Sequence, residues 1–155
     1  LRPGPTFDCL VGELETRALD DLPTVLPGVR EALKALSGCF PVGILCDVQI
    51  TPAPVLRECL EALDLLPLID AAVFSDEVGA SKPLRTGFRT VAEELGVLLT
   101  DVIHIGPSEV RDVAGAHAAG ARAICLGSHQ PTAAEASAVS LLPCVQQVSD
   151  LVDVG

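Results

Sequence analysis

Residues 104–124 read HIGPSEVRDVAGAHAAGARAI, a segment with very few bulky side chains. The apolar run at 102–105 just before the turn has the length and composition of a strand buried on both faces. Apolar residues over 110–117 then recur at helical spacing, and Gly120 is placed to end this helix. Because its side chains are small, we expect the helix to lie close against a sheet, whose next strand is 123–126.

Apolar strands and amphipathic helices also alternate upstream of this segment. Val42–Cys46 and Ala71–Phe74 are short apolar runs typical of buried parallel strands. Helical stripes are predicted at Val29/Leu33/Leu36, Leu56/Leu60/Leu63 and Phe88/Val91/Ala92/Leu95. With a first strand at Phe7–Val11, the sequence predicts an α/β fold, a three-layer α/β/α sandwich with a parallel five-stranded sheet. We expect a single domain over residues 1–155.

The helix boundaries and the C-terminal region carry weaker signals. Thr51 is the predicted N-cap of a helix that Pro52 opens. In the tail, an Ala-rich stretch at 133–139 suggests a helix, Val145 to Val148 suggests a short strand, and 149–154 suggests a turn.

The composition disfavours several kinds of partner and location for this chain. The net charge is −11, which opposes binding to nucleic acid or to anionic membranes. Apolar runs are shorter than the roughly 20 residues of a bilayer span, and no signal-peptide pattern is present, so we expect a soluble protein. The six cysteines form no C-x-x-C pair, which favours a reducing cytoplasm over a disulfide framework.

Ligands of open parallel sheets bind beyond the carboxyl ends of the strands. The residues just after the predicted strands are therefore the candidates: Cys46-Asp47, Ser75-Asp76, Gly106-Pro107 and Gly127-Ser128. His104 lies within an apolar strand, and we interpret it as a hydrogen-bonded core histidine. His117 on a helix and His129 in a loop have no ligand spacing with it, which disfavours a zinc site.

Over residues 25 to 130, three segments resemble, in order and spacing, motifs of the haloacid dehalogenase-like (HAD) superfamily, which has a Rossmannoid fold. They are the strand ending in Cys46-Asp47, the loop Gly79-Ala-Ser-Lys-Pro83, and the run from Gly106 through Asp112 to Gly120. The resemblance implies phosphate binding at Cys46, Asp47 and Lys82, with Lys82 neutralising charge during catalysis. It implies a metal ligand at Asp112, which would hold Mg²⁺ if the site is active. The plainer interpretation makes Cys46 a small buried hydrophobe, Asp47 a turn cap, Lys82 a surface residue and Asp112 a helix-terminal charge.

The sequence also departs from the family pattern, at the metal-binding acid and at the nucleophile motif. The first metal-binding acid is replaced by Pro107, which has no side-chain oxygen. The nucleophile motif has two possible registers: Asp8 would be the nucleophile with Leu10 replacing the general acid, or Gly12 and Leu14 replace both acids. Leucine cannot transfer a proton in either case. A single nucleophile at Asp8 without Mg²⁺ resembles the metal-free dehalogenase branch of the family.

Three functions follow as hypotheses. The leading one is an impaired or inactive phosphatase homologue that serves as a binding or assembly module, without a cofactor, for a small phosphorylated ligand or a protein partner. The second is an active hydrolase, either a phosphatase or a metal-independent dehalogenase using Asp8. A receiver-like signalling domain with Asp47 is disfavoured, because strands follow Lys82-Pro83. The chain leaves no room for a cap domain before Pro27 or between Asp47 and Lys82, and in the family an open core accompanies macromolecular substrates or oligomers, so a homodimer is possible.

Overall fold

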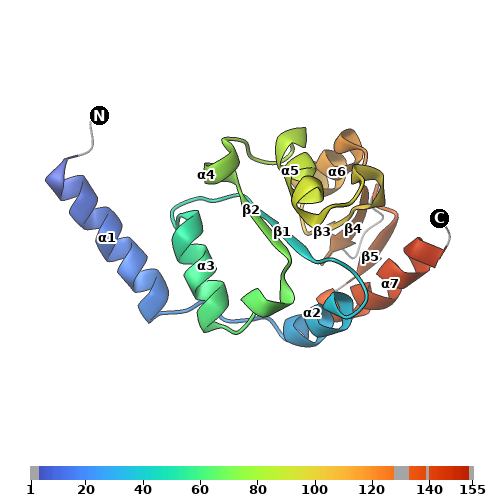
Figure 1. The fold of residues 1–155 in the computed structure, drawn as a ribbon, viewed down its shortest axis with the longest axis horizontal. Coiled ribbons are helices and arrows are strands. Elements are labelled where there is room, and N and C mark those ends of the chain that lie inside the picture. The colour runs from blue at the N-terminus through green and yellow to red at the C-terminus, as the bar shows by residue number, and fades with distance from the viewer. Residues whose placement is uncertain (1–3, 128–132, 139, 154–155) are drawn as a thin grey trace.

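Among the described residues, five parallel strands form the centre of the structure, but they lie in two sheets (Figure 1). The computed structural model describes residues 4–127, 133–138 and 140–153. In one sheet, β1 (Gly43–Cys46) pairs with β2 (Ala71–Phe74). In the other, β3 (Ile103–Gly106), β4 (Arg122–Leu126) and β5 (Ala136–Ala138) pair in that order. The predicted α/β class with parallel strands is confirmed, whereas the single continuous sheet is not observed.

Helices alternate with these strands along the chain. They are α1 (Pro5–Asp20), α2 (Val29–Ser37), α3 (Ala53–Ala62), α4 (Ser75–Val78), α5 (Arg85–Leu95), α6 (Ala114–Ala119) and α7 (Leu141–Asp153). Short helical turns occur at Leu66–Leu68 and Leu99–Asp101, and a π-helical turn at Glu109–Val113 precedes α6. None of the helices in the described part of the chain is long and apolar enough to cross a membrane.

Helices cover both faces of the β3–β5 sheet. Ala123 and Cys125 of β4 pack in one cluster with Phe88 of α5 and with α6. Ile124, between them in sequence, packs on the other face with Leu36 of α2 and with α7. All three β4 residues are essentially inaccessible to solvent. Because successive side chains of a strand point to opposite faces, the apolar run at 123–126 reflects burial on both sides, as predicted.

Helix α6 lies as close to its neighbours as its small residues suggested. A Cβ atom added at Gly115 would come within 3.0 Å of Pro83 and 3.1 Å of the Phe88 ring. These distances are tighter than ordinary van der Waals contacts, so Gly115 lets the loop that carries Lys82 pack directly on α6.

The predicted strand at residues 7–11 is wrong, because this segment lies inside α1. The helix has a proline in its first turn, Asp8 near its N-terminus and Arg17 in its last turn, all favourable placements. It contacts the body through α3, where the Cys59 thiol donates to the Ala18 carbonyl at 3.5 Å. In Figure 1, α1 extends away from the strands. A short apolar run cannot separate strand from helix by periodicity alone.

The C-terminal predictions are also corrected. Residues 136–138 pair with β4 instead of forming a helix, and their register with β4 places Ala138 in the core. The segment 145–148 and residues 149–153 belong to α7, in which Cys144 and Val148, four residues apart, are both buried, whereas Val154 lies outside the described residues. Tertiary contacts override the helix preference of alanine here. At α3, the N-cap is Pro52, one residue later than predicted.

Candidate functional site

Lys82 lies where the carboxyl ends of β1 and β3 meet. Its Nζ donates to the Asp112 carboxylate at 2.6 Å and to the Leu45 carbonyl at 3.3 Å. Its backbone N–H donates to the Asp47 carboxylate at 2.9 Å. The structure therefore brings together three of the predicted site residues, Lys82, Asp47 and Asp112.

Asp112 is a buried carboxylate, with 3% of its surface exposed. Its Oδ1 bonds to Lys82 Nζ and to His104 Nε2, the latter at 3.0 Å, and its Oδ2 accepts the Ser108 N–H at 2.9 Å. Burial alone would raise the pKa of Asp112, but the hydrogen bonds from His104, Lys82 and the Ser108 N–H outweigh it. The pKa of Asp112 is therefore held well below its usual range, and this carboxylate is ionised at neutral pH.

The turn before α6 is built to hold Asp112 in this position. The Asp112 N–H donates to the Ser108 carbonyl at 2.8 Å, while the Ser108 hydroxyl accepts the Arg111 N–H at 3.1 Å. A Cβ atom at Gly106 would lie 2.7 Å from both Cβ and Oδ2 of Asp112 and would overlap Cγ. Glycine is therefore needed at the end of β3 to admit the carboxylate.

His104 is hydrogen-bonded and largely buried, as the sequence suggested. Its side chain is 13% exposed, and its ring meets the Phe88 ring edge-on with centroids 5.1 Å apart. The sequence did not indicate that its partner is Asp112. Their alignment depends on the π-helical turn, which spacing in the sequence did not reveal.

Cys46 and Asp47 end β1 beside Lys82. Burial raises the pKa of the Cys46 thiol, and the nearby Lys82 charge only partly opposes this. A neutral thiol is a weak hydrogen-bond donor and a poor anion ligand. Asp47 Oδ2 lies 3.8 Å from Arg111 Nη1, so its charge is shared between the Lys82 N–H and this guanidinium. The phosphate-binding roles of Cys46 and Asp47 stay predictions.

The remaining candidates lie elsewhere. Asp8 is exposed on α1, and the structure does not bring it to Lys82. His117 bonds to Glu135 at 3.0 Å, and Glu135 also accepts the Ala123 N–H at 2.7 Å, so this pair ties α6 to the segment before β5. His129 lies outside the described residues.

The residues around Asp112 do not fit Mg²⁺. This ion requires several oxygen ligands in near-octahedral geometry, yet both carboxylate oxygens of Asp112 already accept hydrogen bonds. The ammonium group of Lys82 occupies the place of a cation, and Pro107 offers no side-chain oxygen. Within residues 4–127, 133–138 and 140–153, no cluster of three or more histidine, cysteine or acidic side chains is arranged to hold a metal.

Comparisons of sequence and of structure with known proteins point to the same family. The model of the haloacid dehalogenase-like hydrolases matches residues 6–120. Phosphoglycolate phosphatase of Escherichia coli (strain K12) is 29% identical over 103 residues, which cover 66% of this chain and 39% of that enzyme. The matched segment therefore spans well under half of the length of this curated relative.

Solved structures show the same architecture. A HAD phosphatase from Thermococcus onnurineus is 26% identical, with a TM-score of 0.74 over 88% of this chain and 63% of that chain. A putative HAD-hydrolase from Bacillus subtilis bound to magnesium is 16% identical, with a TM-score of 0.78 over 92% of this chain and 63% of that chain. The second likeness concerns the fold alone.

Proposed function

Because the chain belongs to the haloacid dehalogenase-like hydrolases, we propose that residues 1–155 form a catalytically impaired phosphatase homologue that serves as a binding module. One observation carries this proposal: the buried Asp112 carboxylate is fully engaged by Lys82, His104 and the Ser108 N–H. A carboxylate that accepts bonds on both oxygens and pairs with an ammonium group is a structural anion. It is poorly placed to ligate Mg²⁺ or to accept a proton.

Loss of catalysis is supported at two further positions. Pro107 cannot replace a metal-binding acid. Asp8, the candidate nucleophile, lies on α1 and not at the end of a strand beside Lys82. Nucleophilic attack requires the attacking oxygen within about 3.5 Å of the reacting atom. The arrangement therefore favours neither phosphatase nor dehalogenase chemistry using Asp8.

A small phosphorylated ligand is the candidate for binding. An ammonium group carries three donors, and two of those on Lys82 bond to Asp112 and Leu45. The Lys82 side chain is 14% exposed, so the third donor can reach a ligand oxygen at the mouth of the site. A phosphate group, with several acceptor oxygens, matches such a donor.

Turnover assays test the impaired-enzyme part of the proposal. We expect no hydrolysis of p-nitrophenyl phosphate, 2-phosphoglycolate or a 2-haloacid, with or without Mg²⁺, and no effect of Mg²⁺ on the melting temperature. Mg²⁺-dependent hydrolysis that disappears in Lys82→Met, or dehalogenation that disappears in Asp8→Asn, would show that the chain is an active enzyme.

Titration calorimetry with 2-phosphoglycolate and with inorganic phosphate tests the binding part. We expect weak binding that is lost in Lys82→Met and retained in Lys34→Met, because Lys34 is the chain's other lysine and is exposed on α2. Equal affinities of these two variants would exclude Lys82 as the phosphate ligand.

A further inference from the structure

The outer edge of β2 is the edge that faces away from β1, and a side chain from α3 covers it. Arg57 Nη2 donates to the Ala72 carbonyl of β2 at 2.7 Å. We propose that Arg57 closes this edge and so prevents β2 from pairing with β2 of a second copy of the chain. The inference goes beyond the proposed function, because it concerns assembly of the chain and not phosphate binding.

The backbone groups of Ala72 belong to this outer edge. The Ala71 N–H donates to the carbonyl of Val42, the residue before β1, and Ala71 is paired with Gly43 of β1. Because the backbone groups of successive residues in a strand point in opposite directions, those of Ala72 face away from β1. Among the described residues, no strand pairs with this edge. Unpaired N–H and C=O groups along an edge are a template for another strand.

The sequence of β2 would favour pairing if its edge were open. The strand reads Ala-Ala-Val-Phe, carries no charge and contains no proline. Charges and prolines on an edge strand are the usual obstacles to pairing. Two copies related by a two-fold axis would place their β2 strands side by side and antiparallel, which closes both edges at once. A second copy of this chain is therefore the partner that β2 fits.

Three further contacts hold Arg57 in place over the edge. Its Nη1 and Nη2 donate to the two carboxylate oxygens of Glu77 at 2.5 and 2.9 Å, and its guanidinium carbon lies 4.7 Å from the centroid of the Phe74 ring. Phe74 ends β2 and Glu77 lies in α4 directly after it. Paired bonds to a carboxylate and contact with an aromatic face fix the plane of a guanidinium. An incoming strand would have to displace this charged group from all of its partners.

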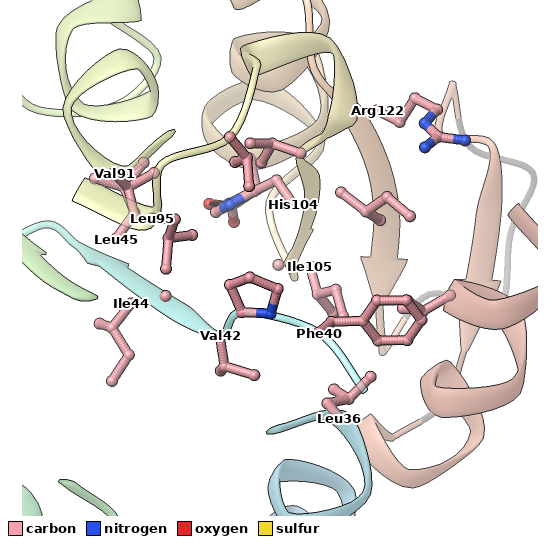
Figure 2. Close-up of a pocket in the computed structure, with 18 of the residues that line it drawn as sticks. Leu36, Phe40, Val42, Ile44, Leu45, Val91, Leu95, His104, Ile105 and Arg122 are labelled. Carbon is pink, nitrogen blue, oxygen red and sulfur yellow. Dashed lines mark hydrogen bonds and ion pairs between the residues drawn. The ribbon is translucent and has the colours of Figure 1, made fainter. Parts of the chain in front are cut away.

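Arg57 reaches the edge from the face of the strands opposite α5. Figure 2 shows Leu45 of β1 next to Val91 of α5, with Ile44 on the opposite side of the strand. Ile44 is paired with Ala72, so the Ala72 side chain also faces away from α5. Helix α3 supplies Arg57 on that side, where its side chain is 36% exposed. The guanidinium therefore lies at the boundary between the covered face of β2 and the solvent.

The outer edge of the second sheet shows the same type of contact. The Ala138 carbonyl of β5 accepts the Gly127 N–H at 2.7 Å, so the carbonyl of Ser137 faces away from β4. Gln147 of α7 donates to this carbonyl through Nε2 at 2.7 Å. A helix side chain thus occupies an outward carbonyl on the edge strand of each sheet, which supports a protective role for the contact at β2.

Sedimentation velocity of Arg57→Leu tests the inference. Leucine keeps apolar contact with the Phe74 ring but removes the donors and the charge. We expect the mass at high protein concentration to be twice that of the unaltered chain. Arg89→Leu is the matched control, because it removes the same charge from an exposed side chain of α5 that pairs with Glu93 at 3.5 Å, and its mass should be unchanged. An unchanged mass of folded Arg57→Leu, or an equal increase in Arg89→Leu, would overturn the inference.

A proline in β2 distinguishes edge pairing from general association. The Ala72 N–H faces away from β1, so Ala72→Pro removes a donor of the outer edge without loss of a bond to β1. Arg57→Leu combined with Ala72→Pro should return to the mass of the unaltered chain, and a mass that stays doubled would overturn the inference.

Hydrogen–deuterium exchange gives a second readout of where the copies meet. Exchange at residues 71–74 should slow with rising concentration of Arg57→Leu and should not change in Arg89→Leu. Doubling of the mass without this protection would place the contact elsewhere and overturn the inference. Arg57→Gln also removes the charge and shortens the side chain, so it is expected to behave like Arg57→Leu and keeps the inference falsifiable if Arg57→Leu does not fold.

Discussion

Lys82→Met should destabilise the protein far more than loss of one lysine from the surface. The substitution keeps most of the apolar stem but removes the ammonium group from Asp112, whose side chain is only 4% exposed. Removing one partner of a buried ion pair costs about 3–5 kcal/mol. His104 and the Ser108 N–H remain to bond the carboxylate, so we expect a loss of about 2–3 kcal/mol at neutral pH.

Urea unfolding followed by far-UV circular dichroism measures this loss, because the chain has neither Trp nor Tyr for fluorescence. The midpoint should fall by about 1 M urea. Lys34→Met, which alters an exposed lysine, should change stability by no more than about 0.5 kcal/mol. A reducing agent is needed because the six cysteines are free. If the two lysine variants unfold at the same urea concentration, the assignment of Asp112 as an anion stabilised by Lys82 is refuted.

The pH dependence gives the same prediction an independent check. The pKa of Asp112 in the folded protein lies below its unfolded value of 3.8, so ionised Asp112 stabilises the fold above that pH. This stabilisation is lost as the pH falls from 3.8 towards the folded pKa. Lys82→Met should raise the folded pKa of Asp112, and the stability difference between variant and parent should shrink below pH 3.8. A difference that is constant between pH 7 and pH 2 would contradict the mechanism.

Other substitutions and reagents test further parts of the structure. Gly106→Ala should cost about 1–3 kcal/mol in urea unfolding, because its Cβ would overlap Asp112, whereas Gly12→Ala, in open space on α1, should stabilise by up to about 1 kcal/mol. Hydrogen bonds from His117 and the Ala123 N–H lower the pKa of Glu135 against the opposing effect of burial. In thermal melts, Glu135→Gln should therefore cost more stability at pH 7 than below pH 4.5. An equal loss of stability at the two pH values would contradict a stabilising role of ionised Glu135. Ellman's reagent should label two cysteines in the native protein and three others only after unfolding; the first two are Cys9 and Cys39, and the others are Cys59, Cys125 and Cys144.

Most of the strands, and the helices that cover them, were predictable because their signals are local. The runs at 42–46, 71–74 and 123–126 are apolar and bounded by turn residues, and each contains a parallel strand of the structure. The strands at 71–74 and 123–126 are mostly buried as predicted, whereas β1 is only partly buried. The small residues of α6 also indicated its close packing, which Gly115 now shows against Pro83. Such features depend on burial within one segment, which composition and periodicity report directly.

The errors arose where the outcome depends on distant contacts. The run at 7–11 is too short to distinguish strand from helix, and a favourable proline and charges at the helix ends are consistent with α1. Residues 136–138 have helical composition but pair with β4, and Glu135 bonds to the β4 backbone just before them. The division of the strands into two sheets depends on residues far apart in the chain, so no local sequence pattern could predict it.

Pro107 and the Lys82–Asp112 pair lie at the same end of the site. Pro107 offers no side-chain oxygen beside Asp112, and Lys82 and His104 both bond to the Asp112 carboxylate. Lys82 also donates to the Leu45 carbonyl near the end of β1. One side chain therefore links β1 to the turn before α6, so a substitution at Lys82 should change both the stability of the fold and the binding of a phosphate group.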